Sequence, residues 1–260
     1  MKIGIIGYGT VGKAVEYGFN SPTNQFTIVD NSISGTTTED VVNTDVVFVC
    51  LPTDAGGRLD LYTTTEVLNH LVYYKYKGLV VLKSAMPPGA LDLPNFDSAR
   101  TNLRLAFNPD SVGQVQPNRD FVEASMIIIG AETQPVIDSL KEVYEQSNVI
   151  KKWFMVMTTN EAILMKLFID TFLATKAVVI GEFSDMLSKY SDRDWNDFAV
   201  MMTHDPRIGR SMTQINDQPG YDSTHYPAIM DAFARAATRL QTRSGTVAGA
   251  MVSNTLLKAK

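Results

Sequence analysis

The sequence has few of the side chains that build disulfides and metal centres. Among its 260 residues there is one cysteine, Cys50, and there are three histidines, His70, His204 and His225. A single cysteine excludes a disulfide within the chain and a cysteine-rich zinc site. The histidines have no metal-ligand spacing. We therefore expect no bound metal ion.

The sequence also lacks an excess of positive charge and long apolar runs. Lysine and arginine number 23 against 28 acidic residues, which gives a net charge of −5. This balance argues against nucleic acid as a partner. Lysine, aspartate and glutamate interrupt the longest apolar stretches, so we expect no membrane span. A strand signal begins at residue 2; we therefore expect no signal peptide and take the cytoplasm as the expected compartment.

The first thirty residues contain a strand, a glycine-rich loop, a helix and a second strand that ends in an acid. In order these are Lys2–Ile6, Gly7-Tyr8-Gly9-Thr10-Val11-Gly12, 13–19, 26–29 and Asp30. Gly7 permits a tight turn, Gly9 lets the backbone approach a pyrophosphate, and Gly12 lets the helix pack close to the strand. The N–H groups at the helix start, at Thr10 and Val11, are free to meet phosphates. Asp30 would accept both ribose hydroxyls and repel a 2′-phosphate, so the pattern predicts an NAD site.

Strand and helix signals alternate over roughly the first 150 residues. Strand signals follow at 45–51, 79–82, 103–107 and 126–129, and helix signals at 63–76 and 134–145. Capping-box spacing at 36–39 predicts a short helix. This alternation is typical of an α/β fold with a doubly wound parallel sheet. We expect a Rossmann-type NAD-binding domain over residues 1–150.

The character of the sequence changes after residue 150. One long helical pattern runs from 158 to about 189, and its part from 162 to 180 is apolar almost all round. A helix this apolar must be buried on most sides, and pairing with a second copy achieves that. Further helices are expected at 194–202 and 228–242, with a loop region at 205–227. We therefore expect residues 151–260 to form a long central helix and a helical dimerisation domain, and the protein to be a homodimer.

From residue 45 onwards, short motifs follow one another in a characteristic order. They are Val49-Cys50-Leu51-Pro52-Thr53, Gly57-Arg58-Leu59-Asp60-Leu61, Lys83-Ser84-Ala85-Met86-Pro87, Asn108-Pro109-Asp110, Glu161-Ala162 with Lys166, Asp170 and Leu173-Ala174-Thr175-Lys176, Asp205-Pro206-Arg207-Ile208-Gly209, and Pro219-Gly220-Tyr221. In this order they resemble the UDP-glucose/GDP-mannose dehydrogenase family. Members of that family use NAD to oxidise the C6 alcohol of a nucleotide sugar to a carboxylate in two hydride transfers.

The resemblance implies roles for individual residues. Pro52, Thr53 and Lys83 would lie on the cofactor side, and Lys166 would stabilise a developing alkoxide. The residues implied in substrate binding are Asp110, Arg207, Gly220 and Tyr221. For Arg207, which in the family reaches across the dimer to the partner's substrate, a solvated loop cation is an equal alternative.

The sequence departs from the family where the second oxidation is performed. The family's nucleophilic cysteine is replaced by His225, and its neighbouring lysine and aspartate by Ala228 and Ile229. The remaining cysteine, Cys50, lies within a strand signal, where we expect a small core residue. Imidazole is a poor substitute for a thiolate in trapping an aldehyde. We therefore expect one hydride transfer instead of two, and no counterpart of the family's C-terminal UDP-binding domain.

Three candidate catalytic residues remain: Lys166, Asp170 and His225. Lys166 and Asp170 are spaced i,i+4 on the long helix and share a face, so they form either a structural ion pair or a working pair. In a working pair, Asp170 would hold Lys166 charged or accept the alcohol proton, and His225 is the other candidate base. Two functions stay open: an NAD-dependent oxidoreductase acting on an alcohol of a sugar or nucleotide sugar, and an NAD-binding pseudoenzyme that works as a dimeric binding or regulatory protein.

Overall fold

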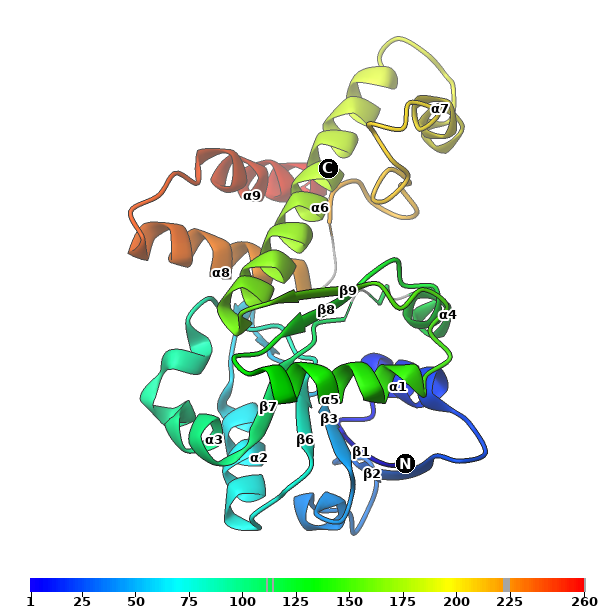
Figure 1. Cartoon of the computed structure of the whole chain (residues 1–260). Coiled ribbons are helices and arrows are strands. Elements are labelled where there is room, and N and C mark those ends of the chain that lie inside the picture. Colours follow the sequence, from blue (N-terminus) through cyan, green and yellow to red (C-terminus); the bar gives the residue numbers. More distant parts are fainter. Residues whose placement is uncertain (111, 114, 222–224, 260) are drawn as a thin grey trace. The chain divides into compact units, whose positions relative to one another are not determined.

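The computed structural model describes residues 1–110, 112–113, 115–221 and 225–259. The chain forms two compact units (Figure 1). Unit 1 comprises Met1–Thr53 and Asp60–Lys166, and unit 2 comprises Asp54–Leu59 and Leu167–Lys260. These bounds differ from the domains predicted at 1–150 and 151–260, which stay a prediction. The difference arises because a strand after residue 150 completes the sheet of unit 1, and a short hairpin before residue 60 belongs to unit 2.

A seven-stranded sheet is the centre of unit 1. Its strands are β1 (Lys2–Ile6), β2 (Gln25–Val29), β3 (Val46–Val49), β6 (Leu79–Leu82), β7 (Arg104–Phe107), β8 (Ile127–Gly130) and β9 (Phe154–Met157), in the spatial order β2-β1-β3-β6-β7-β8-β9. Neighbouring strands are parallel except β7 and β8, which pair antiparallel at Phe107 and Gly130. The predicted Rossmann-type α/β fold is confirmed, but a wholly parallel sheet is wrong at this one pair.

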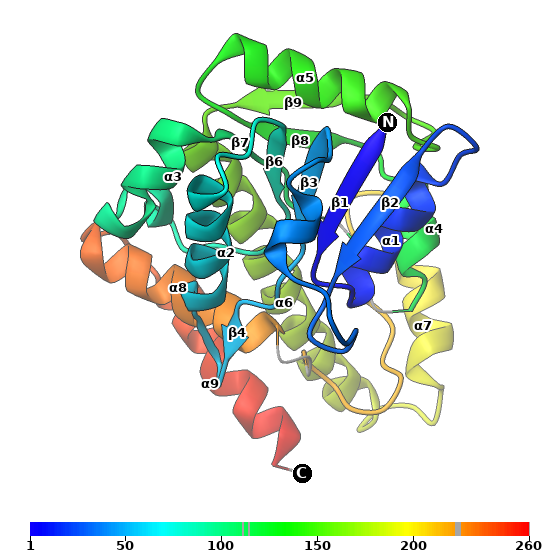
Figure 2. The ribbon, with the colours of Figure 1, turned by 90° about the horizontal axis from the view of Figure 1, so that it is seen from below.

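Helices cover both faces of the sheet, and Figure 2 shows α1 and α2 on opposite sides of it. One face packs on α1 (Thr10–Phe19), α4 (Pro117–Val122) and α5 (Gln134–Glu145), through a core that includes Phe19, Phe48 and Leu140. On the other side lie α2 (Tyr62–Tyr73), α3 (Asp97–Asn102) and the 3₁₀ helix η1 (Thr38–Val41). Every residue of β3, β6 and β8 is buried. Burial on both faces explains why these strands are unbroken apolar runs in the sequence.

Some element bounds were predicted wrongly. The capping box is one residue later than expected: Thr37 and Asp40 form it, and η1 follows. The sequence analysis also missed β9, α3 and α4, and two short 3₁₀ helices, η2 (Ala90–Asp92) and η3 (Pro94–Phe96).

Unit 2 is helical apart from the small hairpin of β4 (Asp54–Ala55) and β5 (Arg58–Leu59). Its helices are the part of α6 (Thr159–Leu187) from Leu167 onwards, α7 (Trp195–Met202), α8 (His225–Arg239) and α9 (Gly245–Lys258). Small residues of α6, including Ala174 and Ala177, pack with Met230 of α8 and Ala250 of α9. The sequence analysis did not predict α9, and it began α8 three residues too late. As a consequence His225, expected in a loop, is the first residue of a helix.

Within the described part of the chain, no helix is long and apolar enough to cross a membrane.

Candidate functional site

The glycine loop lies where the order of the strands changes direction. The chain goes from β1 to β2 on one side and then to β3 on the other side of β1. Open α/β sheets bind their ligands at such a switch point, beyond the carboxyl ends of the strands. Gly7 has φ +91°, and a Cβ on it would lie 2.6 Å from the carbonyl oxygen of Cys50, at the end of β3. The loop is therefore packed against the end of β3, and only glycine fits at its first position.

The other two glycines have different surroundings. A Cβ on Gly12 would lie 2.1 Å from the carbonyl oxygen of Gly7, so Gly12 lets α1 approach the loop. A Cβ on Gly9 would meet nothing within 4 Å. Gly9 is the N-cap residue of α1, and no side chain caps this helix start. In the described residues the start of α1 is therefore without a side-chain cap, which leaves its first-turn N–H groups available to a pyrophosphate.

Asp30 follows β2 and is tied to the glycine loop. Its Oδ2 accepts a hydrogen bond of 2.6 Å from the backbone N–H of Tyr8, and its Oδ1 accepts from the N–H and hydroxyl of Ser32 at 2.9 and 2.7 Å. The Ser32 hydroxyl and these backbone donors lower the pKa of Asp30 to about 2. A carboxylate that is fixed and ionised, with lone pairs to spare, is suited to two ribose hydroxyls.

Two further loops at this end of the sheet are joined to each other. The Thr53 hydroxyl donates to the carbonyl of Ala85 at 2.9 Å, and the Ser84 hydroxyl donates to the carbonyl of Leu51 at 2.6 Å. These bonds connect the segment after β3 with the segment after β6. The cofactor contacts expected of Pro52 and Thr53 stay predictions.

Lys83, at the end of β6, has surroundings unlike those expected of a cofactor ligand. It is 2 % exposed, and its ammonium donates to Oδ1 of Asn108 at 2.9 Å. Tyr144 of α5 donates to the same oxygen at 2.6 Å, and Asn108 donates to the carbonyl of Ile128 at 2.6 Å. Burial lowers the pKa of Lys83 to about 8. This geometry favours a role inside the domain over contact with a phosphate.

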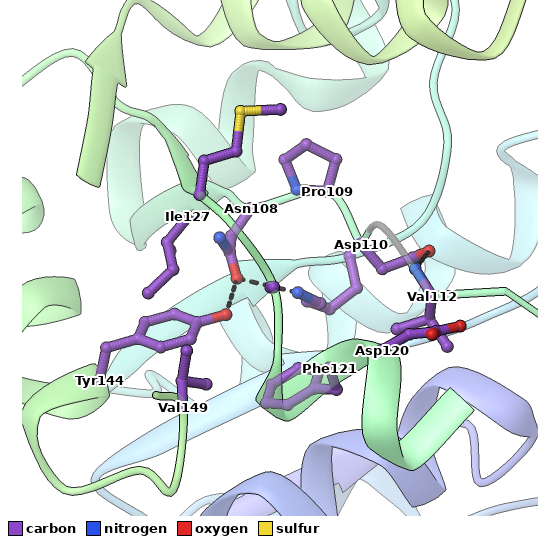
Figure 3. A pocket seen from close by; sticks show the side chains of 12 residues that line it. Asn108, Pro109, Asp110, Val112, Asp120, Phe121, Ile127, Tyr144 and Val149 are labelled. Atoms are coloured by element: carbon purple, nitrogen blue, oxygen red, sulfur yellow. Dashed lines mark hydrogen bonds between the residues drawn. The ribbon is translucent and has the colours of Figure 1, made fainter. Parts of the chain in front are cut away.

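The hydrogen bonds around Asn108 lie beside a cavity of about 20 Å³ (Figure 3). Polar side chains of Asn108, Asp110, Asp120 and Tyr144 line it together with apolar ones such as Phe121. The volume is enough for about one water molecule. Sequence reasoning missed Asn108 as the partner of Lys83 and Tyr144 as the second donor to Asn108. The signal for Tyr144 is its place on the apolar face of α5, where a buried phenol needs a hydrogen-bond partner.

Lys166 and Asp110, which were predicted as catalytic and substrate-binding residues, lie close together in unit 1. Lys166 Nζ is 4.0 Å from Oδ1 of Asp110, and the side chains are 12 % and 18 % exposed. Asp110 Oδ1 also accepts from the backbone N–H of Val112 at 3.3 Å. A partly buried ion pair of this kind is screened less by salt than a surface pair.

The two candidate bases, Asp170 and His225, form a hydrogen-bonded pair within unit 2. Nε2 of His225 is 3.0 Å from Oδ2 of Asp170. The side chain of Asp170 is 7 % exposed and that of His225 is 39 % exposed. When Asp170 is ionised it can only accept, so Nε2 of His225 donates, and in the neutral imidazole Nδ1 then has a free lone pair. The sequence suggested Asp170 as a partner of Lys166 and had not paired it with His225.

Comparison with known proteins agrees with this geometry. Residues 32–148 match the NAD-binding domain of the UDP-glucose/GDP-mannose dehydrogenase family. This segment contains β3, β6, β7, β8 and the loops that follow them. The matched segment is similar to the NAD-binding domain of that family and makes up less than half of the chain. NAD is the cofactor of that domain.

Curated relatives and solved structures of the same kind align with much of the chain. A UDP-glucose 6-dehydrogenase of Rickettsia conorii is 26 % identical over 190 residues, which are 71 % of this chain and 43 % of the relative. A UDP-glucose dehydrogenase from Pyrobaculum islandicum superposes with a TM-score of 0.83 at 21 % identity, over 98 % of this chain and 68 % of that one. A UDP-D-ManNAc dehydrogenase from Pyrococcus horikoshii has a TM-score of 0.80 at 16 % identity. The superposition covers 100 % of this chain and 69 % of that one. The chain thus spans less than half the length of the curated relative, and the structural likeness concerns the fold.

Other residues that the family resemblance implied have mixed surroundings. Arg207 is exposed, and its guanidinium donates to both carboxylate oxygens of Asp205. Tyr221 is buried in the core of unit 2, and its N–H donates to Oδ1 of Asn254 at 2.9 Å. Gly220 has φ +85°, and a Cβ there would lie 2.3 Å from the same oxygen. Packing alone accounts for Gly220 and Tyr221, and the substrate roles of all three stay predictions.

Cys50 does not replace the family's nucleophilic cysteine. It is buried at the end of β3, and burial raises the pKa of its thiol to about 12. A thiol with this pKa is a poor nucleophile at neutral pH. Among the residues with described positions, no three His, Cys, Asp or Glu side chains form a group that could hold a metal ion.

Proposed function

We propose that the protein is an NAD-dependent oxidoreductase that oxidises an alcohol of a sugar or nucleotide sugar by a single hydride transfer. The observation that carries the proposal is the hydrogen bond between Asp170 and His225. His225 occupies the position where the family resemblance expects a cysteine. An Asp–His pair supplies a base for one proton, whereas a second oxidation needs a nucleophile that traps the aldehyde.

The chemistry divides between a base and a cation. NAD, when bound, would supply the acceptor for the hydride that leaves the alcohol carbon. His225 accepts the hydroxyl proton at Nδ1, while Asp170 holds the ring and stabilises the charge that forms on it. The family resemblance assigns to Lys166, which lies 4.0 Å from Asp110 within unit 1, the stabilisation of the negative charge on the alcohol oxygen.

The substrate class is proposed from the relatives. The curated relative from Rickettsia conorii is a UDP-glucose 6-dehydrogenase, which makes UDP-glucose the first substrate to test. Asp110, Arg207, Gly220 and Tyr221 are the proposed substrate contacts. Arg207 is exposed, but its Nε and Nη2 already donate to Asp205, so a phosphate would have to displace that carboxylate or meet the Nη1 side of the guanidinium.

We further propose a homodimer formed through α6. Exposed apolar side chains recur along this helix in unit 2 at Phe172, Val179, Phe183 and Met186. Their spacing of seven, four and three residues keeps them on one stripe of the helix. A stripe of this kind can pair with itself about a two-fold axis. Light scattering of the wild type should give twice the chain mass, and a Phe172→Glu, Phe183→Glu variant should give the mass of one chain.

The function is tested by counting NADH formed per sugar. The purified protein is incubated with NAD and a limiting amount of UDP-glucose, and then with a panel of other nucleotide sugars and free polyols. One NADH per sugar, with the aldehyde as product, is expected. Two NADH per sugar would overturn the single transfer. If no substrate is turned over while NAD still binds, the alternative function of an NAD-binding pseudoenzyme is favoured. A chain that has a complete glycine loop but an altered catalytic position is consistent with that alternative.

A further inference from the structure

Tyr8 stands between the first two glycines of the glycine loop. Gly7 lies in the left-handed region at φ +91°, and a Cβ built on Gly9 would have nothing within 4 Å. Glycine loses more conformational freedom on folding than any other residue, so holding this turn in one conformation is unfavourable in entropy. Contacts made by the Tyr8 side chain can offset that loss.

The side chain of Tyr8 is held on α1. Its hydroxyl donates a hydrogen bond to Oε2 of Glu16, and both residues are half-buried. The ammonium of Lys13 lies 5.6 Å from the centre of the ring, and Tyr8 also packs against the core that contains Phe19. A hydrogen bond to a carboxylate is stronger than one between neutral groups, and a cation over the ring adds attraction. Tyr8 therefore ties the glycine loop to α1.

The backbone of the same residue holds the carboxylate that is expected at the adenosine ribose. The N–H of Tyr8 donates to Oδ2 of Asp30 at 2.6 Å, which joins the loop to the residue that follows β2. Tyr8 thus connects three parts of a dinucleotide site: the glycine loop, the helix that begins after it, and the acid. A site whose groups are already in place loses less conformational entropy when its ligand binds.

We propose that Tyr8 is a positioning residue of the NAD site. Its hydrogen bond to Glu16 braces the glycine loop and Asp30 in the conformation that receives the pyrophosphate and the ribose. Loss of this bond leaves the residues that would contact NAD unchanged but lets the loop move, so NAD binds more weakly. The proposal rests on the cofactor site of the proposed function and does not depend on turnover.

The test measures NAD affinity by calorimetry in variants that remove the hydrogen bond from either end. Tyr8→Phe keeps the ring and removes the hydroxyl, and Glu16→Ala removes the acceptor. Each should raise the Kd for NAD by about threefold to tenfold, and the double variant should add little, because both substitutions remove the same bond. Glu16→Gln keeps an acceptor and should stay closer to the wild type. Tyr17→Phe, at an exposed tyrosine of the same helix, is the matched control and should leave the Kd unchanged.

Amide hydrogen exchange in the NAD-free protein separates bracing from other roles of Tyr8. In Tyr8→Phe and in Glu16→Ala, the N–H of residue 8 should exchange faster than in the wild type. An unchanged Kd in either folded variant would overturn the proposal, even if urea unfolding showed a loss of stability. A weaker Kd with unchanged exchange would also overturn it, because the phenol would then contact the cofactor itself.

The same measurements distinguish this proposal from the proposed function. A wild type that binds no NAD would refute the cofactor site and the role of Tyr8 together. A wild type that binds NAD through a braced loop but oxidises no substrate would refute the proposed oxidoreductase and leave the role of Tyr8 standing.

Discussion

Asp170, in the middle of α6, and His225, the first residue of α8, are joined by a hydrogen bond of 3.0 Å between Oδ2 and Nε2. The bond gives the imidazole one orientation and leaves its other nitrogen as an acceptor. Since Asp170 is buried and His225 is partly exposed, the pair resembles an oriented general base more than a surface ion pair.

Replacing either member of this pair should reduce turnover without reducing NAD affinity. His225→Gln removes the base and should lower kcat by about a hundredfold or more. Asp170→Asn presents an amide that favours the other tautomer and should have a smaller effect. Steady-state kinetics with NAD titrations measure both. His204→Gln, at an exposed histidine whose ring has a hydrogen bond with the carbonyl of Val200, is the matched control. Unchanged kcat in His225→Gln would exclude this residue as the base.

The glycine loop predicts opposite effects for two alanine substitutions. Gly12→Ala places a Cβ against the carbonyl of Gly7 and should lower the free energy of unfolding by about 1–3 kcal/mol. Gly9→Ala places its Cβ in open space, so stability should change little while NAD binding weakens. Urea unfolding and calorimetric NAD titration distinguish the two. Normal NAD affinity in Gly9→Ala would mean that the pyrophosphate does not approach this position.

Asp30 should determine the preference for NAD over NADP. Asp30→Asn keeps an acceptor for the N–H of Tyr8 but removes the charge, so NAD should bind about tenfold more weakly. The affinity for NADP should rise relative to the affinity for NAD, because the repulsion of its 2′-phosphate is removed. Calorimetry with both nucleotides measures the ratio, and Glu142→Gln, on the exposed side of α5, is the control. An unchanged ratio would place the adenosine ribose away from Asp30.

Sequence patterns could predict the parts of the fold in which local and tertiary preferences agree. The strand runs of β3 and β6 are apolar because both faces of the sheet are covered, and α5 has the bounds that its periodicity indicated. The helices α3 and α4 have six residues each, which is too short for a helical period to show. Gly245 and Gly249 weaken the helix signal of α9. The antiparallel direction of β8 has no local signature.

The candidate site was predictable where it depends on one continuous segment and not where distant residues meet. The glycine loop and Asp30 lie within thirty residues of the start. The partner of Lys83, Asn108, is 25 residues further along the chain, and Tyr144, which also donates to Asn108, is 36 residues beyond that. Asp170 and His225 are 55 residues apart. The sequence had offered Lys166 as the partner of Asp170, because local spacing was the only geometry available there.

Cys50 should be chemically inert in the folded protein. With its pKa raised to about 12 by burial, only about one thiol in ten thousand is ionised at pH 8. A disulfide reagent such as DTNB should therefore label it only after unfolding, with a stoichiometry of about one. Cys50→Ala should retain any turnover that the wild type has. Rapid labelling of the native protein, or loss of turnover in a folded Cys50→Ala, would restore the thiol as a candidate nucleophile.

The burial of Lys83 predicts a pH dependence of stability with a definite sign. Its pKa of about 8 in the folded protein lies below the ordinary value of 10.5. Between these two values the unfolded chain binds more protons, so the free energy of unfolding rises with pH across this window. Relative to Lys83→Met, which has no such proton, the wild type should gain at most about 3 kcal/mol between pH 8 and 10.5. Urea unfolding of both proteins over this range measures the difference, in which the titration of all other lysines cancels. Lys77→Met, at an exposed position, should instead follow the wild type in parallel. If the difference in free energy of unfolding between the wild type and Lys83→Met stays constant with pH, Lys83 keeps its ordinary pKa. The carboxylate of Asp110 would then fully compensate its burial.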